Sequence, residues 1–358
     1  MDDTAIPPPA IRTARTRPAW ALLFLRLAVT VVLMWLVVRS IEWRAFFSLL
    51  ERCDWRWWLA GFTTGLGATT LAAIRWAALS RPIGFVFPTT TFVWRFFEGQ
   101  FFNCFMPSSI GGDLVKAYRL ADSTAGRLLA GCTVLADRLT GLSALCVIAG
   151  TALLTQRWDL RTPTALVVGA GFLTLAIAAF WLGVGSIDRI LSLIPEHHRA
   201  RRFLSKLLPY QQHPHLMTQA VGWSLIVQMG GSLAVAFMAR SLGVSLPLLT
   251  WFTVVPLVTL SMTIPVTING VGIREGGLAF LLKPAGVSAD AAIAIGLLWF
   301  IATNLGGLIG GVLFMVDRTA TASPGKAGPA DPSAIPAVPA SSGPATATHD
   351  SDSRRPRP

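Results

Sequence analysis

The chain has 358 residues, of which 53% are hydrophobic and only 13% are charged. Soluble domains carry about 25% charged residues, so the composition argues against a soluble enzyme and indicates a protein that crosses a membrane several times. The 30 basic residues exceed the 18 acidic ones, which gives a formal net charge of +12. Because the arginines lie between apolar runs and form no single basic stripe, the excess fits anionic lipid headgroups, and no nucleic-acid partner is expected.

Residues 1–18 form a short, basic, proline-rich lead, which we expect to be cytoplasmic. Six apolar runs in the predicted membrane domain, residues 19–318, are long enough to span a bilayer at about 1.5 Å per residue. They are Trp20–Val38, Trp57–Leu79, Leu129–Leu154, Thr164–Gly185, Leu216–Ala239 and Ala289–Val316. The sequence therefore predicts an all-α polytopic membrane protein. Residues 319–358 are rich in Pro, Ala and Ser and are predicted to be a disordered tail.

Two further apolar stretches, Phe85–Met106 and Leu246–Ile264, are each followed by a break rich in Pro and Gly. The breaks at 107–112 and 265–270 share the pattern P-x-[ST]-I-[GN]-G. We expect each stretch to form a re-entrant, broken-helix hairpin, which enters and leaves the membrane on one face. The matching breaks predict an internal repeat.

The charge of the loops predicts the orientation of this repeat. The loop 186–215 is the most basic inner loop and is placed in the cytoplasm. The two halves, at about 19–155 and 163–318, then read span, span, hairpin, span in opposite orientations, with both termini cytoplasmic. Residues 39–56, with four arginines, fall outside against the positive-inside rule. Inverted repeats with broken segments in corresponding positions point to a substrate site near the bilayer midplane.

The first break and the residues around it carry the first candidate site. We expect a helix beginning near Asp113, whose free N–H groups would bind an anion, and Lys116 and Arg119 would add phosphate affinity. The alternative is a capped loop in which Asp113 only complements the helix dipole. The candidate residues are Gln100, Asn103, Pro107, Ser108, Ser109, Gly111, Gly112, Asp113, Lys116 and Arg119.

The second break carries the second candidate site. Arg274 is the best single candidate for binding a phosphate, because its planar guanidinium meets phosphate oxygens with two hydrogen bonds. Glu275 would pair with an arginine or carry a coupled proton. The alternative is an exposed ion pair between Arg274 and Glu275 in a loop. The candidate residues are Pro265, Thr267, Asn269, Gly270, Gly272, Arg274, Glu275, Gly276 and Gly277.

Charged residues inside the apolar runs are the third signal, because each costs about 2.5–3.5 kcal/mol at a helix centre and such residues usually face protein or water. Asp137 and Arg138 are adjacent and cannot share one helix face, so they should have different partners. Glu98 is the suggested partner of Arg138. The set comprises Glu98, Asp137 and Arg138, together with Arg95 and with Arg26 and Arg75, which lie nearer span ends where they could reach the headgroups.

No metal, cofactor or catalytic residue is expected. The four cysteines, Cys53, Cys104, Cys132 and Cys146, have no C-x-x-C spacing, and the histidines at 197–215 lie in a predicted surface loop without a cysteine. Four glycines of the last span form overlapping G-x-x-x-G pairs, which favour close packing within the molecule over dimerisation. They are Gly306, Gly307, Gly310 and Gly311.

Three segments resemble the lysylphosphatidylglycerol synthase transmembrane-domain family of flippase-like proteins. They are QFFNCFMPSSIGGDLVKAYRL at 100–120, ADRLTG at 136–141 and IPVTINGVGIREGGLAFLL at 264–282. The resemblance covers roughly 19–318 and implies a multi-span protein of the bacterial inner membrane that moves lipids or lipid-linked molecules between leaflets. Some members carry a fused transferase domain. The chain outside the membrane part is too short for one, so we expect any lipid-modifying partner to be encoded separately.

The leading hypothesis is a flippase-like transporter for an anionic lipid or lipid-linked molecule, with phospholipid and membrane as its partners. One alternative is an intramembrane lipid-modifying enzyme that uses Asp113, Asp137 or Glu275. No paired metal-ligand spacing, nucleophile elbow or catalytic histidine motif supports it, so the chain is not expected to be an enzyme. The other alternative is a non-transporting scaffold for a lipid-modifying partner.

Overall fold

The computed structural model describes most of the predicted membrane domain. The described residues are 28, 31–32, 34–36, 38–39, 41–106, 110–155, 163–184, 187–195, 201, 204–212, 214–263, 267 and 269–320. The predicted basic lead 1–18, most of the first predicted span and residues 321–358 of the predicted tail lie outside this set. The described residues form helices and no strands, which confirms the all-α class.

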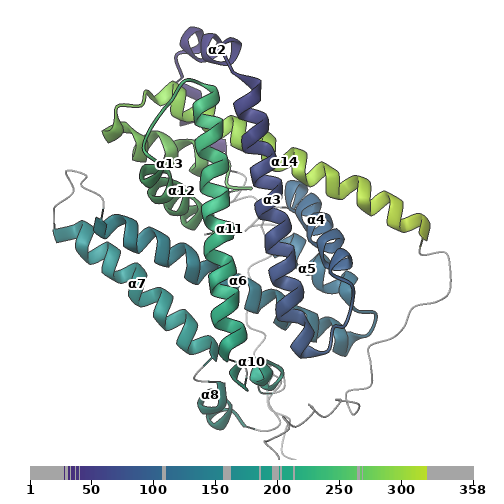
Figure 1. Ribbon diagram of the computed structural model, residues 1–358. Helices are drawn as coiled ribbons and strands as arrows, with labels where there is room; N and C mark the ends of the chain where they lie inside the picture. Colours follow the sequence, from purple (N-terminus) through teal and green to yellow (C-terminus); the bar gives the residue numbers. More distant parts are fainter. Residues whose placement is uncertain are drawn as a thin grey trace, which may run out of the picture.

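The helices follow the apolar runs and their breaks (Figure 1). The α-helices of the described residues, from α2 onward, are α2 (Trp43–Glu51), α3 (Trp55–Ser80), α4 (Thr89–Phe105), α5 (Ile110–Leu120), α6 (Thr124–Thr155), α7 (Pro163–Val184), α8 (Ile187–Leu193), α10 (Leu208–Gln212), α11 (Pro214–Ser241), α12 (Leu248–Thr263), α13 (Ile273–Leu282) and α14 (Ala289–Ala320). Short 3-10 turns occupy Arg81–Ile83, Ser205–Leu207 and Lys283–Ala285. The helix after the first break thus begins at Ile110, three residues before the predicted start.

Three of the described helices are long and apolar enough to cross a membrane: Thr124–Leu154, Pro214–Ser241 and Ala289–Val316. Each overlaps a predicted span. Helix α3 also covers the predicted span Trp57–Leu79, and helix α7 overlaps the predicted span Thr164–Gly185. The count of six spans stays a prediction.

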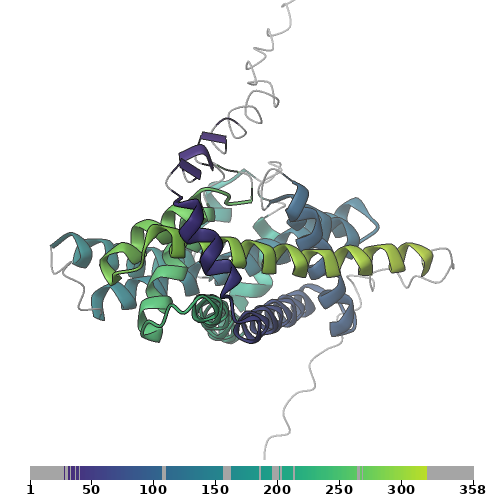
Figure 2. The ribbon, with the colours of Figure 1, turned by 90° about the horizontal axis from the view of Figure 1, so that it is seen from above.

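Helices α3 and α11 run side by side along one face of the molecule (Figure 1). They are seen nearly end-on when the molecule is viewed from above, with α14 crossing the molecule beside them (Figure 2). Small residues let the two helices approach closely: a Cβ atom added at Gly61 would lie 2.7 Å from the carbonyl oxygen of Ala234. Close contact through small residues is the usual way in which helices associate in a membrane.

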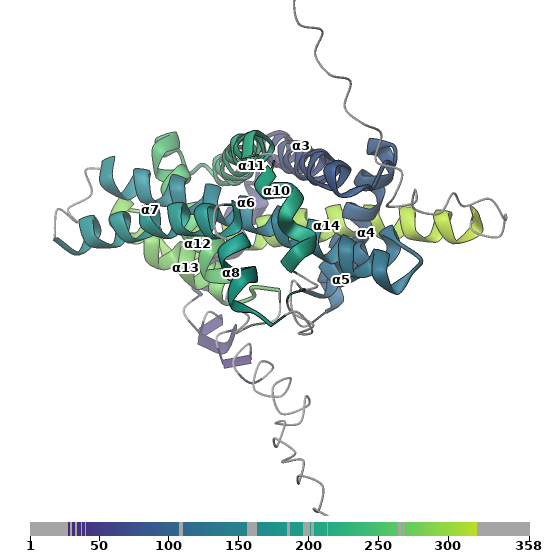
Figure 3. The same cartoon turned by 90° about the horizontal axis from the view of Figure 1, so that it is seen from below.

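Each Pro/Gly break joins two helices that pack against each other, α4 with α5 and α12 with α13. The two helix pairs lie on opposite sides of the α3–α11 pair (Figures 1 and 3). Helix α4 also packs along α14, from the other half of the chain, and α12 packs along α6. The breaks therefore produce hairpins, and each hairpin is held by a long helix from the opposite half.

Two groups of buried side chains form the hydrophobic interior. One lies where α11, α12, α13 and α14 meet and includes Trp251, Val258, Leu278 and Ile295. The other lies between α3, α4, α5 and α6 and includes Trp76 and Phe92, whose rings contact edge to face. Each hairpin thus has its own core, and the space between the two cores is available for a site.

The glycines of α14 pack inside the molecule, as predicted. A Cβ atom at Gly307 would lie 3.4 Å from the carbonyl oxygen of Gln100, and one at Gly310 would overlap the carbonyl oxygen of Phe97. Both neighbours belong to α4. These glycines therefore set the distance between α14 and the first hairpin.

We expect Gly310→Ala to lower the free energy of unfolding by about 1–3 kcal/mol, because the added methyl group must push α4 away from α14. Gly131→Ala is the matched control, since a Cβ atom there meets nothing within 4 Å. Thermal unfolding of the purified protein in detergent measures both. Equal stability of the two variants would show that α4 can move away from α14 without a loss of stability.

Candidate functional site

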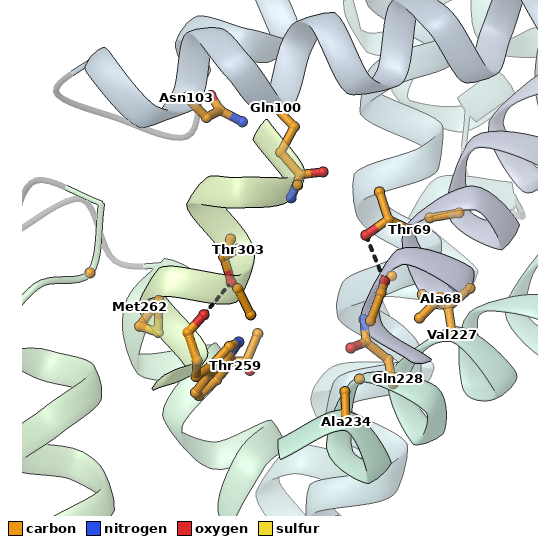
Figure 4. A pocket seen from close by; sticks show the side chains of 18 of the residues that line it. Ala68, Thr69, Gln100, Asn103, Val227, Gln228, Ala234, Thr259, Met262 and Thr303 are labelled. Carbon is orange, nitrogen blue, oxygen red and sulfur yellow. Dashed lines mark hydrogen bonds between the residues drawn. The ribbon is translucent and has the colours of Figure 1, made fainter. Parts of the chain in front are cut away.

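A cavity of about 490 Å³ lies between the two hairpins and helices α3, α6, α11 and α14. Figure 4 shows three of its walls: Gln100 and Asn103 from α4, Thr259, Met262 and Thr303 from α12 and α14, and Thr69 and Gln228 from α3 and α11. Apolar residues such as Phe62, Leu142 and Val227 complete the lining. The cavity thus combines polar groups with surface that suits lipid.

A buried ion pair forms one part of the lining. Arg75 of α3 donates through Nε to Asp137 Oδ1 of α6 at 2.8 Å, and its Nη1 donates to Ser224 Oγ of α11 at 2.6 Å. Only 6% of the Arg75 side chain and 8% of the Asp137 side chain are exposed. Arg75 therefore joins three helices inside the protein. The sequence suggested that it could reach the lipid headgroups, and the structure shows that it does not.

Asp113, in the first turn of α5, connects two more cations of the lining. Its Oδ2 lies 2.7 Å from Arg138 Nε, and its Oδ1 lies 3.2 Å from Lys116 Nζ. Lys116 also lies 3.7 Å from the centre of the Phe96 ring, a favourable cation–π contact. The structure corrects the suggested partner of Arg138 from Glu98 to Asp113, while Asp137 and Arg138 do have different partners, as predicted.

Glu98 instead holds the first hairpin together. It is fully buried, and it accepts from Arg95 Nη1 at 2.9 Å and from Arg119 Nη2 at 3.2 Å. Lys116 and Arg119, predicted to act together, are thereby separated: Lys116 lines the cavity, and Arg119 ties α5 to α4.

Close backbone contact in the same hairpin explains its glycines. The amide N–H of Gly112 donates to Asn103 Oδ1 at 2.7 Å, and a Cβ atom at Gly112 would overlap the carbonyl oxygen of Gly99. Gly111 is equally close to Met106. These two glycines let α5 fold back on α4, and Asn103 holds the turn from the cavity side.

The second hairpin holds its cation away from the cavity. Arg274 is 2% exposed, donates to Glu275 Oε1 at 3.0 Å, and lies 4.8 Å from the centre of the Phe300 ring. Glu275 Oε2 accepts from the amide of Gly272 at 2.7 Å and so caps α13. The Arg274–Glu275 pair exists, as one alternative held, but it is buried and not exposed.

The structure brings nine of the candidate residues singled out from the sequence into the lining of one cavity: Arg75, Gln100, Asn103, Lys116, Asp137, Arg138, Thr267, Asn269 and Gly270. The other described candidates lie outside the lining: Arg95, Glu98, Gly111, Gly112, Asp113, Arg119, Gly272, Arg274, Glu275, Gly276 and Gly277. The candidates at Arg26, Pro107, Ser108, Ser109 and Pro265 lie outside the described residues. Asn269 and Gly270 have φ angles of 53° and 70°, so the backbone turns sharply where it borders the cavity.

Several lining residues were not singled out from the sequence, above all Gln228, Thr303 and Trp299. A single amide in the middle of an apolar run, as at Gln228, is a signal that could have identified it, because such groups usually face protein or a cavity. The threonines give no such signal, since a threonine hydroxyl can bond to its own helix. Thr303 does this, to the carbonyl oxygen of Trp299 at 2.9 Å.

The family described as lysylphosphatidylglycerol synthase TM region matches residues 23–311. The chain belongs to this family. The match spans both hairpins and the cavity between them. No curated protein and no solved structure matches the sequence. The family match and the apolar helices together identify a multi-pass membrane protein from a lipid-related family.

Proposed function

We propose that this member of the family is a flippase-like transporter, which moves an anionic lipid or lipid-linked molecule between leaflets and does not modify it. The observation that carries the proposal is the set of three cations, Arg75, Lys116 and Arg138, on the wall of a cavity at the junction of two broken-helix hairpins. Cations inside a membrane protein are costly and usually serve a substrate or ion. The headgroup would occupy the cavity while the acyl chains stay in lipid.

The packing of the hairpins supports an inverted repeat around this cavity. Exchange of the two halves of the chain would turn the α4–α14 contact into the α12–α6 contact, and would leave the α3–α11 pair in place. Inverted repeats that meet at a central site are the architecture of many alternating-access transporters. Rocking of one hairpin against the other would open the cavity to each leaflet in turn.

We further propose that the protein lies in a bacterial inner membrane with both termini and 186–215 in the cytoplasm. In a background without the four native cysteines, Arg157→Cys should react with a membrane-impermeant maleimide in intact cells, and His198→Cys should not. Labelling of His198→Cys alone would contradict the inverted orientation of the halves.

A leaflet-resolved assay tests transport directly. Purified protein is reconstituted in vesicles that contain phosphatidylglycerol with an NBD-labelled acyl chain, and dithionite is added to destroy the label in the outer leaflet. We expect a flippase-like protein to expose the inner-leaflet label as well, and a parallel sample without dithionite should contain the lipid unchanged in mass. A changed lipid mass would identify an enzyme, and a protected inner leaflet with unchanged lipid would favour a scaffold.

A further inference from the structure

The charges around the cavity do not balance, and their sum restricts the headgroup. Three cations and one carboxylate line it, namely Arg75, Lys116, Arg138 and Asp137. A second carboxylate, Asp113, lies behind the wall and bonds to both Lys116 and Arg138. Three positive charges against two negative charges leave one net positive charge among the described residues at this wall.

The surplus charge is presented to the cavity mainly by Arg138. Its side chain is 45% exposed, against 6% for Arg75 and 6% for Lys116. Arg75 is held by Asp137 and Ser224, so its charge is already matched. A ligand that enters the cavity therefore meets the guanidinium of Arg138 first.

One net positive charge in a weakly screened interior is matched by one negative charge. A phosphodiester carries one negative charge, whereas a phosphomonoester carries about 1.5 to 2 at neutral pH. A headgroup with a net positive charge would place like charges together at Arg138, which costs several kcal/mol in such contacts.

The rest of the lining indicates uncharged hydroxyl groups next to the phosphodiester. Thr267 is 5% exposed and borders the cavity, and its Oγ1 has no hydrogen-bond partner in the part of the chain that the structure describes. Leaving a buried hydroxyl unpaired costs free energy. Amides that both donate and accept, Gln100, Gln228 and Asn269, also line the cavity. These groups suit a polyol better than a second charge.

We propose that the cavity selects a lipid whose headgroup is a phosphodiester with a single net negative charge and uncharged hydroxyl groups, and that it rejects headgroups with a net positive charge. This inference rests on the proposed function for the location of the site, and it specifies the ligand class. The proposed ligand therefore differs from lysylphosphatidylglycerol, the cationic, aminoacylated lipid in the name of the family.

Binding to the full-length protein in detergent tests the inference without any transport. The probe is radiolabelled dioctanoyl phosphatidylglycerol, and the unlabelled competitors are the dioctanoyl forms of phosphatidylglycerol, phosphatidylethanolamine, lysylphosphatidylglycerol and phosphatidic acid. We expect phosphatidylglycerol to compete at least about tenfold better than the others, a difference that one unmatched charge readily produces. Soluble glycerophosphoglycerol should compete more weakly, because it lacks the acyl chains.

Two variants change the charge sum in opposite directions. Lys116→Gln lowers it to zero and should reduce the preference for phosphatidylglycerol over phosphatidylethanolamine by about tenfold. Asp137→Asn raises it to two and should shift the preference toward phosphatidic acid, while Arg75 keeps Ser224 as a partner. A variant that only lost its fold would bind all four lipids less and would show no shift.

Equal competition by lysylphosphatidylglycerol and phosphatidylglycerol would overturn the inference, as would an unchanged order of affinities in both variants. Equal affinity for glycerophosphoglycerol would overturn a lipid as the ligand. The proposed function fails separately: a protein that shows this order of affinities but leaves the inner-leaflet label protected in vesicles selects this headgroup without transporting it.

Discussion

Replacing Arg138 with glutamine should slow lipid movement by about 100-fold, which corresponds to the loss of one charge-assisted contact of about 2–3 kcal/mol in the substrate complex. The protein should remain folded, because Asp113 keeps Lys116 as a partner and because the Arg138 side chain is 45% exposed to the cavity. The NBD-phosphatidylglycerol assay in vesicles measures the rate, and thermal unfolding in detergent measures the stability.

Arg127→Gln is the matched control for this prediction. Arg127 lies on the same helix, α6, but it donates to the carbonyl oxygen of Ala121 and lies over the Tyr118 ring, outside the cavity lining. Its loss should leave the rate within about twofold of the parent, as for most surface substitutions. Arg138→Lys should be intermediate, because lysine retains the charge and loses the planar fork. Parental rates in Arg138→Gln would exclude the cavity as the path of the headgroup.

The helical architecture could be predicted from the sequence because its signals are local. Apolar runs gave α6, α11 and α14, and the Pro/Gly breaks gave both hairpins. The glycines of α14 also indicated a close helix contact, since only small residues permit one. Each of these features depends only on the residue types within one segment, so the sequence is enough to predict it.

The partners of the charged residues could not be predicted in the same way. Asp113 and Arg138 are 25 residues apart and meet because α5 packs on α6. Arg75 and Asp137 are 62 residues apart, and Ser224 comes from the other half of the chain. The sequence shows that each charge needs a partner, but the choice among several carboxylates is made by helix packing. The sequence alone allows Glu98 as the partner of Arg138, but in the structure Glu98 pairs with Arg95 and Arg119.

The position of Arg274 shows the same limit at the second hairpin. A glycine-rich break followed by arginine and glutamate predicts an anion site, and nothing local indicates that the side chain turns away from the cavity. In the structure it packs under Phe300 and Trp299 of α14. Arg274 and Lys116 thus both make cation–π contacts, Arg274 with α14 and Lys116 with Phe96. Of the two, only Lys116 borders the cavity.

This burial leads to the second large expected effect. Arg274→Ala should lower the free energy of unfolding by about 3–5 kcal/mol, the usual result of removing one partner from a buried ion pair. Glu275 would keep its contact with the amide of Gly272 but would lose the cation beside it, in a site where its side chain is only 9% exposed. Chemical or thermal unfolding in detergent measures the loss.

A double variant separates this structural role from a role in binding substrate. Arg274→Met with Glu275→Gln removes both charges, keeps an acceptor for the Gly272 amide, and fills the space under Phe300, so it should recover most of the lost stability. If Arg274 only holds α13 to α14, the double variant should also transport lipid at close to the parental rate. Arg274 Nη2 has no hydrogen-bond partner in the described part of the chain, so this nitrogen could bind a substrate if the side chain turned. A double variant that is stable but inactive would mean that this guanidinium turns into the cavity during the transport cycle, and it would restore Arg274 as a phosphate ligand.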